Sequence, residues 1–80
     1  MEFEWDEAKR LSNLAKHGLD FANSSQFDWA GATILSDRRV DYGENRFRAF
    51  AMLNEEFCSI AYTLRGAVTR ILSLRLANRK

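Results

Sequence analysis

The chain has 80 residues, the size of a single domain (residues 1–80), and its 46% hydrophobic and 29% charged residues exclude an intrinsically disordered protein. One cysteine and one histidine exclude a disulfide framework and a Cys/His zinc site, so we expect neither a metal nor a cofactor. The acidic N-terminal segment and the lack of an apolar run of about 18 residues predict a cytoplasmic protein that does not span a membrane.

Charge is distributed unevenly along the sequence. Residues 1–37 carry three basic and seven acidic side chains (net −4), whereas residues 38–80 carry nine basic and four acidic ones (net +5). Nine of the twelve basic residues are arginine, whose planar guanidinium suits bidentate contact with phosphate. Two interpretations follow, a solvated basic surface or a surface that binds RNA.

The first half of the chain predicts a strand and two helices. Residues 2–5 alternate polar with aromatic side chains, and Asp6 then stands where a helix N-cap belongs. The first helix ends before Gly18, and its apolar positions at helical spacing are Ala8, Leu11, Leu14 and Ala15. The opposite stripe is polar, with Lys9, Asn13 and Lys16. Asp20 can cap a second helix that reaches about Phe27.

The second half predicts strands. One covers residues 32–35, and after a connection over residues 38–45 three more cover about 46–53, 57–64 and 67–74. We therefore predict an α+β fold in which two N-terminal helices pack on one face of a small antiparallel β-meander, with a short helical turn beginning near Arg75. The other face of the sheet is left for function.

Cleavage of RNA without a metal requires a base for the 2′-hydroxyl proton, cations around the phosphate and an acid for the leaving oxygen. The single histidine, His17, is the best-suited base, and the less suited ones are Lys16, Tyr42, Glu44 and Tyr62. His17 also has a structural interpretation, because a histidine in the last turn of a helix interacts favourably with the helix dipole.

Four arginines on or beside the predicted strands can supply the cations: Arg46, Arg65, Arg70 and Arg75. Strand geometry restricts them, because Arg70 and Arg75 have opposite parity and would point to opposite faces of one straight strand. A bend or a helix start near Leu74 is needed to bring them together. Cys58 is expected to be a buried hydrophobe, and the aromatic candidates for base stacking are Trp29, Tyr42 and Tyr62.

Three blocks of the sequence resemble the BrnT toxin family, whose members have a RelE-like ribonuclease fold. The first block contains Phe3, Glu4, Trp5, Asp6, Lys9, Asn13, Lys16, His17, Gly18, Phe21 and Ala22. The second contains Asp37, Arg39, Gly43, Glu44 and Arg46. The third contains Thr63, Arg65, Gly66, Arg70, Ile71, Ser73, Arg75 and Ala77. In the family a longer charged helix usually follows the last strand, and this sequence departs from that pattern at Asn78, Arg79 and Lys80.

The resemblance implies a ribonuclease toxin that inhibits translation and growth and is neutralised by a BrnA-like antitoxin in a complex with two chains of each kind. DNA is then contacted only through the antitoxin. The implied catalytic residues are His17, Glu44, Arg65, Arg70 and Arg75. The implied RNA-binding residues are Lys16, Arg46 and Arg79. An alternative is a non-catalytic module that binds the partner and acts as a corepressor.

Overall fold

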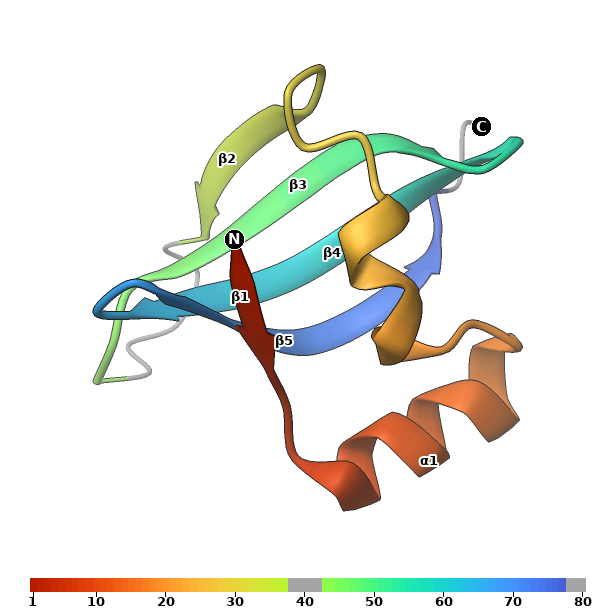
Figure 1. The fold of residues 1–80 in the computed structure, drawn as a ribbon, viewed down its shortest axis with the longest axis horizontal. Coiled ribbons are helices and arrows are strands. Elements are labelled where there is room, and N and C mark those ends of the chain that lie inside the picture. The colour runs from red at the N-terminus through yellow and green to blue at the C-terminus, as the bar shows by residue number, and fades with distance from the viewer. Residues whose placement is uncertain (38–42, 78–80) are drawn as a thin grey trace.

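The computed structural model describes residues 1–37 and 43–77. The elements in chain order are β1 (Glu2–Glu4), α1 (Glu7–His17), the 3-10 helix η1 (Phe21–Gln26), β2 (Thr33–Asp37), β3 (Arg46–Leu53), β4 (Glu56–Arg65) and β5 (Val68–Leu76). Figure 1 shows a twisted sheet with η1 lying across one face and α1 on the side of β5. The strands predicted at 46–53, 57–64 and 67–74 are thus confirmed to within two residues at each end.

The sheet is mixed, with the strand order β1-β5-β4-β3-β2. Strands β2 to β5 form an antiparallel meander, but β1 pairs in parallel with β5, Glu2 lying opposite Val68. The predicted fold of two helices on an antiparallel meander is therefore wrong, although the protein is still broadly α+β. The parallel pair joins two segments that lie at opposite ends of the sequence, so no local pattern predicts it.

The second predicted helix is a 3-10 helix. Asp20 caps it, because its Oδ1 accepts a hydrogen bond from the Ala22 N–H at 2.9 Å. Asn23, Ser24 and Ser25 follow, and such side chains compete for backbone hydrogen bonds and weaken an α-helix. The helical turn expected near Arg75 is also wrong, since β5 continues through Arg75 to Leu76 and keeps its pairing with β4.

Helix α1 begins and ends as its sequence predicts. Asp6 is the N-cap and accepts a hydrogen bond from the Lys9 N–H at 3.1 Å. Gly18 closes the helix in the left-handed conformation, at φ 73°, and its N–H donates to the Leu14 carbonyl. Such a cap favours glycine, because a Cβ is strained at this φ.

The packing of α1 does not follow its amphipathic pattern. Leu11 is 52% exposed and Leu14 36%, whereas the one buried residue of the helix is Asn13. The Asn13 side chain donates to the Leu74 carbonyl at 2.7 Å and accepts from the Leu74 N–H at 3.2 Å. It also donates to the Leu19 carbonyl. The amide thus pairs with β5 as a neighbouring strand would, and it fixes α1 beside that strand.

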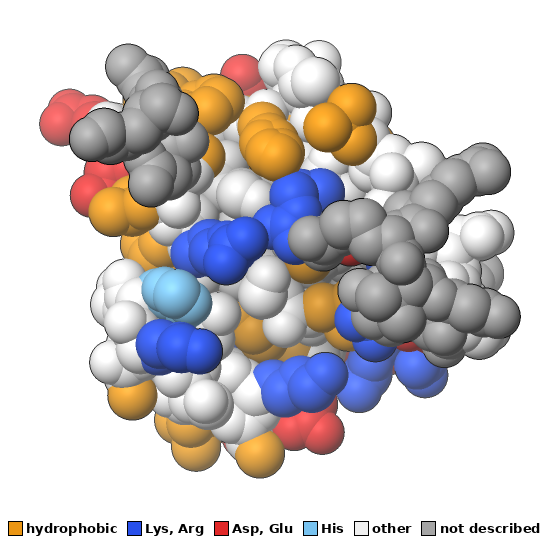
Figure 2. Space-filling model, turned by 180° about the vertical axis from the view of Figure 1, so that it is seen from behind, with side chains coloured by type: hydrophobic (Ala, Val, Ile, Leu, Met, Phe, Trp, Pro, Cys, Tyr) orange, Lys and Arg blue, Asp and Glu red, His pale blue; other side chains and the backbone are white. Residues whose placement is uncertain are grey.

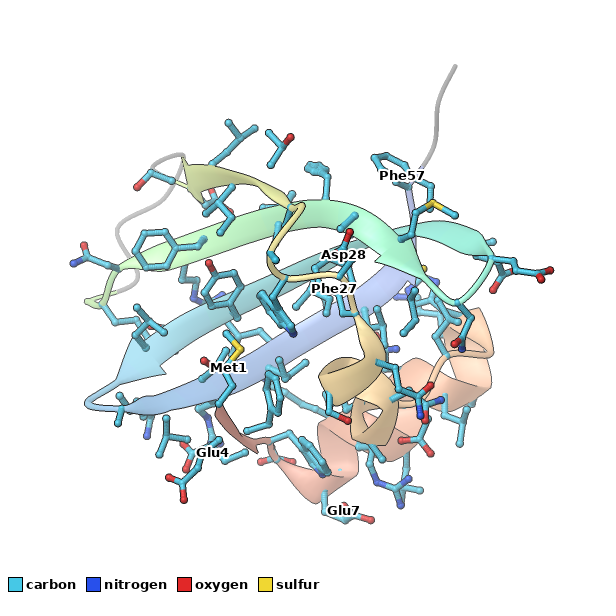
Figure 3. The ribbon with its side chains drawn as sticks, turned by 45° about the horizontal axis from the view of Figure 1, so that its top comes forward. Met1, Glu4, Glu7, Phe27, Asp28 and Phe57 are labelled. Atoms are coloured by element: carbon cyan, nitrogen blue, oxygen red, sulfur yellow. The ribbon has the colours of Figure 1, made fainter. Side chains whose placement is uncertain are left out.

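The hydrophobic core lies between the sheet and η1. Phe21, Ile60, Ile71 and Leu74 are completely buried. An aromatic cluster extends the core toward β1, with ring contacts that link Phe3, Phe27, Trp29, Tyr62 and Phe47. Figure 3 shows Phe27 beside η1 over the sheet, and its backbone forms an isolated bridge with Leu53. Packing therefore covers the middle of this face of the sheet.

Candidate functional site

The sheet face opposite η1, called the open face below, carries most of the predicted cationic residues. Alternate residues of β3, among them Arg46 and Arg48, point away from the core, and in β4 the same alternation selects Ser59, Thr63 and Arg65. Figure 2 shows this face, with Lys and Arg side chains gathered across it and the single histidine beside them. In the sequence, basic and apolar residues alternate at the start of β3, and this alternation indicates which side chains lie on the open face and which on the core face.

A β-bulge brings Arg70 and Arg75 to the same face. Tyr62 pairs with Ile71 and Ala61 pairs with Ser73, so Leu72 is an extra residue on β5. As a result, Arg70 lies opposite Thr63 and Arg75 lies opposite Ser59, two partners that both belong to the open face. The sequence predicted that a bend or helix start near Leu74 was needed, and a bulged residue two positions earlier has that effect.

A hollow of about 480 Å³ lies on the open face where β3, β4 and the end of β5 meet, and is called the sheet hollow below. Its lining residues are Arg48, Phe50, Phe57, Ser59, Arg75, Leu76 and Ala77. Arg48 Nη1 donates to Ser59 Oγ at 3.1 Å, which directs this guanidinium toward β4. Sequence analysis did not select Arg48, although its position two residues after Arg46 places both on one face of a strand.

A second hollow of about 450 Å³, called the helix groove below, lies between α1 and β5. It is lined by Ala8, Lys9, Ser12, Asn13, Lys16, His17, Leu72, Ser73 and Arg75. The structure thus brings three of the predicted residues together: Lys16, His17 and Arg75. The side chains of Lys16 and His17 are exposed. Their position depends on the hydrogen bonds between Asn13 and Leu74, because these bonds hold α1 beside β5. Arg75 lines the sheet hollow as well, so the two hollows share this residue.

The other predicted residues form two separate ion-pair groups. The Glu44 carboxylate lies 3.4 Å from Arg46 Nε and 3.8 Å from Arg65 Nη2. The Arg70 guanidinium is 2.9 Å from the Glu4 carboxylate of β1. By contrast, within residues 1–37 and 43–77 the Arg75 guanidinium has neither an ion pair nor a hydrogen bond. Arg75 is therefore the predicted arginine whose charge is least compensated by described neighbours.

One weaker base candidate, Tyr62, and the single cysteine, Cys58, are buried. Tyr62 is 5% exposed and packs between Trp29 and Phe47, and burial raises the pKa of its phenol, which disfavours a role as base. Burial also raises the pKa of the Cys58 thiol, in agreement with its predicted role as a small hydrophobe. Arg39, Tyr42 and Arg79 lie outside the described residues.

The Trp29 side chain belongs to the aromatic cluster of the core. Its indole N–H donates to the Ser24 carbonyl at 2.9 Å, and its ring contacts Phe3, Phe27 and Tyr62. The predicted interpretation as a base-stacking residue therefore has no support in its position. Among the described residues, Phe50 and Phe57 are aromatic residues on the open face, and neither was a predicted candidate for base stacking.

Across residues 1–37 and 43–77, no group of three or more His, Cys, Asp or Glu side chains is placed to hold a metal ion. In the same part of the chain, no helix has the length and apolar character needed to cross a membrane.

Comparison with known proteins gives one family. A family model described as the ribonuclease toxin BrnT of type II toxin-antitoxin systems matches residues 5–80. The match therefore includes α1, the sheet from β2 onward and both hollows. No curated protein matches the chain.

Proposed function

Because the chain belongs to the BrnT family of ribonuclease toxins of type II toxin-antitoxin systems, we propose that its open face cleaves RNA without a metal ion and so inhibits translation and growth. The observation that carries this proposal is the position of Arg75. Arg75 lines both hollows, the helix groove together with Lys16 and His17, and the sheet hollow together with Arg48. A phosphate at this point meets cations from α1, β3 and β5.

The proposed reaction is an attack by the 2′-oxygen on the adjacent phosphorus. His17 removes the 2′-hydroxyl proton, the P–O bond to the 5′-oxygen breaks, and that oxygen leaves with a proton from solvent. Arg75 stabilises the negative charge that develops on the phosphate oxygens. Lys16 contributes to binding of the same phosphate as a point charge. The products are a 2′,3′-cyclic phosphate and a free 5′-hydroxyl.

The two ion-pair groups have a different proposed role. Arg46, Arg65 and Arg70 already face carboxylates, so we assign them to binding of neighbouring RNA phosphates rather than to the transition state. Glu44 holds two of these guanidinium groups in place. Replacing one of these arginines is expected to weaken RNA binding and to lower its salt dependence, with a smaller effect on the rate of bound substrate.

The test is cleavage of a single-stranded RNA by the purified chain after its separation from the antitoxin. We expect activity in the presence of EDTA, products with a cyclic phosphate, and no cleavage where the scissile nucleotide is 2′-deoxy. Arg75→Ala is expected to lower the rate about 100-fold or more, and His17→Ala by a similar factor. The control is Arg10→Gln, which removes the same charge from a guanidinium held by Glu7 and Asp20 outside both hollows.

Two outcomes would overturn the proposal. Wild-type chain that cuts no RNA, with growth unaffected by its expression, would favour a non-catalytic corepressor. Equal losses for Arg75→Ala and Arg10→Gln would show that only overall charge matters and that the site lies elsewhere.

A toxin of a type II system has an antitoxin protein as its partner. We propose a BrnA-like antitoxin in a complex with two chains of each kind, located in the cytoplasm, which contacts DNA through the antitoxin alone. The exposed Leu11 and Leu14 on α1 are an apolar surface that such a partner can cover. Light scattering of the co-expressed complex tests the stoichiometry, and a mass other than that of two plus two chains would contradict it.

A further inference from the structure

Three apolar residues of α1 lie on the side of the helix that faces away from the sheet. Successive residues of an α-helix are about 100° apart around its axis, so Ala8, Leu11 and Ala15 fall within about 60° of one another. All three are exposed, Leu11 at 52%. On the opposite side of the helix, Asn13 makes the contacts with β5. Helix α1 thus presents an unburied apolar stripe, formed by Ala8, Leu11 and Ala15 and called the outer stripe below.

The helix groove borders the outer stripe and is rich in positive charge. Ala8 belongs to both, and around the helix Ser12 lies between the stripe and two lysines of the groove. The basic residues that line the groove are Lys9, Lys16, His17 and Arg75. None of its described lining residues is acidic, and within residues 1–37 and 43–77 no ion pair joins any of these four side chains. Figure 2 shows hydrophobic side chains below the histidine, at the margin of the molecule where α1 lies.

A single helix of a partner can contact both features. The side chains at the border between them, Ala8, Ser12 and Ala15, are small, which lets a second helix approach α1 closely. A helix that packs over Ser12 has the outer stripe on one side and the groove on the other. Its own apolar residues, at the three- and four-residue spacing of a helical face, then contact Leu11. Acidic residues on its flank lie against the cations of the groove.

We infer that α1 and the helix groove bind an acidic amphipathic helix of the antitoxin, whose carboxylates occupy the groove where an RNA phosphate would bind. A toxin of a type II system has an antitoxin protein as its partner, which gives the class of the occupant. Charge complementarity gives the acidic flank of this helix, and the exposed Leu11 gives its apolar face. A second copy of the chain fits less well, because its own α1 would bring like charges together. The docking surface is independent of the proposed cleavage, whereas the block of RNA binding rests on the proposed function.

The first experiment tests the outer stripe. Calorimetry measures the dissociation constant of the full-length antitoxin for the wild-type chain and for Leu11→Ala. We expect binding to weaken about 10-fold, because the truncated side chain is buried in the complex. Leu64→Ala is the matched control, since Leu64 is 54% exposed but lies on β4, outside the helix groove. Leu11→Ala should cleave RNA at the wild-type rate, and equal affinities of the two variants for the antitoxin would overturn the inference.

The second experiment tests the charge of the groove. Lys16→Gln is expected to weaken antitoxin binding about 3-fold and to lower its dependence on salt, because it removes an exposed cation. Arg10→Gln is the control on the same helix, since this guanidinium pairs with Glu7 and Asp20 and lies outside the groove. It should leave the affinity unchanged. Equal losses for the two variants, or binding that salt does not weaken, would contradict an acidic partner helix in the groove.

The third experiment asks whether the antitoxin and RNA compete for the groove. A short 2′-O-methyl RNA lacks the attacking hydroxyl and is not cleaved, so its displacement from the chain can be followed by fluorescence anisotropy. We expect the antitoxin to displace it, and a complex that holds both at once would overturn the proposed block. A chain that cuts no RNA would defeat the proposed function, while the affinity of Leu11→Ala still decides the docking surface. Self-association of the chain alone that Leu11→Ala abolishes would make a second copy the occupant and overturn the inference.

Discussion

The two faces of the sheet are built from alternate residues of the same strands, yet they differ in every property that bears on function. In β3, Ala49, Ala51 and Leu53 are buried against the core, while Arg46 and Arg48 point to the opposite side. The core face is closed by η1 and the aromatic cluster, whereas the open face carries both the sheet hollow and most of the arginines. Stability and the proposed chemistry can therefore be changed separately in one short strand.

The largest expected effect concerns the core face. Phe21, the first residue of η1, is completely buried. Phe21→Ala is expected to lower the free energy of unfolding by about 3–5 kcal/mol, a large part of the total for a small domain. Urea denaturation measures the change, with Leu64→Ala as an exposed control that should cost under about 0.5 kcal/mol. The cleavage rate per folded molecule should stay unchanged, and a drop in it would mean that the two faces are not independent.

Asn13 is the expected exception to that independence. Asn13→Ala leaves the Leu74 N–H and carbonyl without their partner and is expected to cost about 1–3 kcal/mol of stability. Because the same contacts hold α1 against β5, the variant should also lose cleavage activity per folded molecule through displacement of His17. Thermal unfolding and single-turnover cleavage, measured side by side, test both parts. A less stable variant with full activity would show that His17 does not need this anchor.

The sequence was informative where structure is decided locally. The bounds of α1, its caps and strands β3 to β5 follow from apolar periodicity, Asp6, Gly18 and the turn residues. The parallel pairing of β1 with β5 was not accessible, because the register of a parallel pair depends on contacts between distant segments. The Asp20 cap also indicated a helix after it, and the Asn and Ser side chains that follow favour a 3-10 helix over an α-helix.

The sequence predicted which types of residue form the candidate site, but it did not predict which of them the fold brings together. The sequence selected Lys16, His17 and Arg75, which the structure places around the helix groove. It could not foresee the bulge at Leu72, because one extra residue in a strand leaves no mark in the hydrophobic alternation until the register is known. It also placed Asn13 in the polar stripe of α1, opposite the apolar positions, although Asn13 is the buried residue of the helix and contacts β5.

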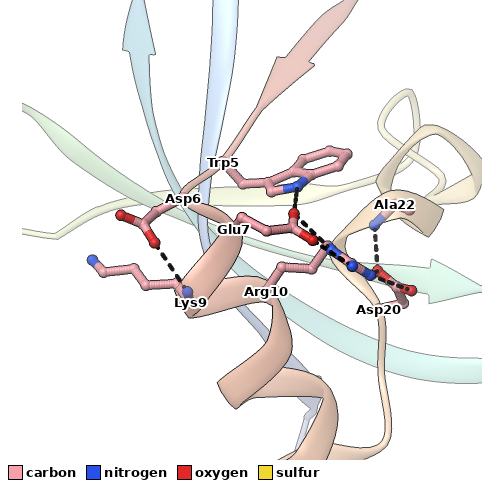
Figure 4. A network of polar contacts seen from close by, with 7 residues as sticks. All are labelled: Trp5, Asp6, Glu7, Lys9, Arg10, Asp20 and Ala22. Carbon is pink, nitrogen blue, oxygen red and sulfur yellow. Dashed lines mark hydrogen bonds and ion pairs between the residues drawn. The ribbon is translucent and has the colours of Figure 1, made fainter.

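The smallest expected effect is a loss of stability at acid pH. It arises from residues of α1 and the segment before η1, which lie on neither face of the sheet. Figure 4 shows the network responsible, in which Arg10 pairs with Glu7 at 2.6 Å and with Asp20 at 3.0 Å. The backbone N–H of Ala22 and the Arg10 guanidinium hold the pKa of Asp20 below its ordinary value of 3.8. The Arg10 hydrogen bond likewise holds the pKa of Glu7 below 4.5.

Because both pKa values are lower in the folded chain than in the unfolded one, the network stabilises the fold fully above about pH 5 and loses its contribution as the pH falls through the folded pKa values. The groups lie near solvent, which screens them, so the change in melting temperature should be smaller than that of either variant above. Asp20→Asn keeps an N-cap side chain but cannot titrate. Its melting temperature should therefore fall less steeply than that of the wild type below pH 4. Parallel curves for the two proteins would show that Asp20 does not cause the acid sensitivity.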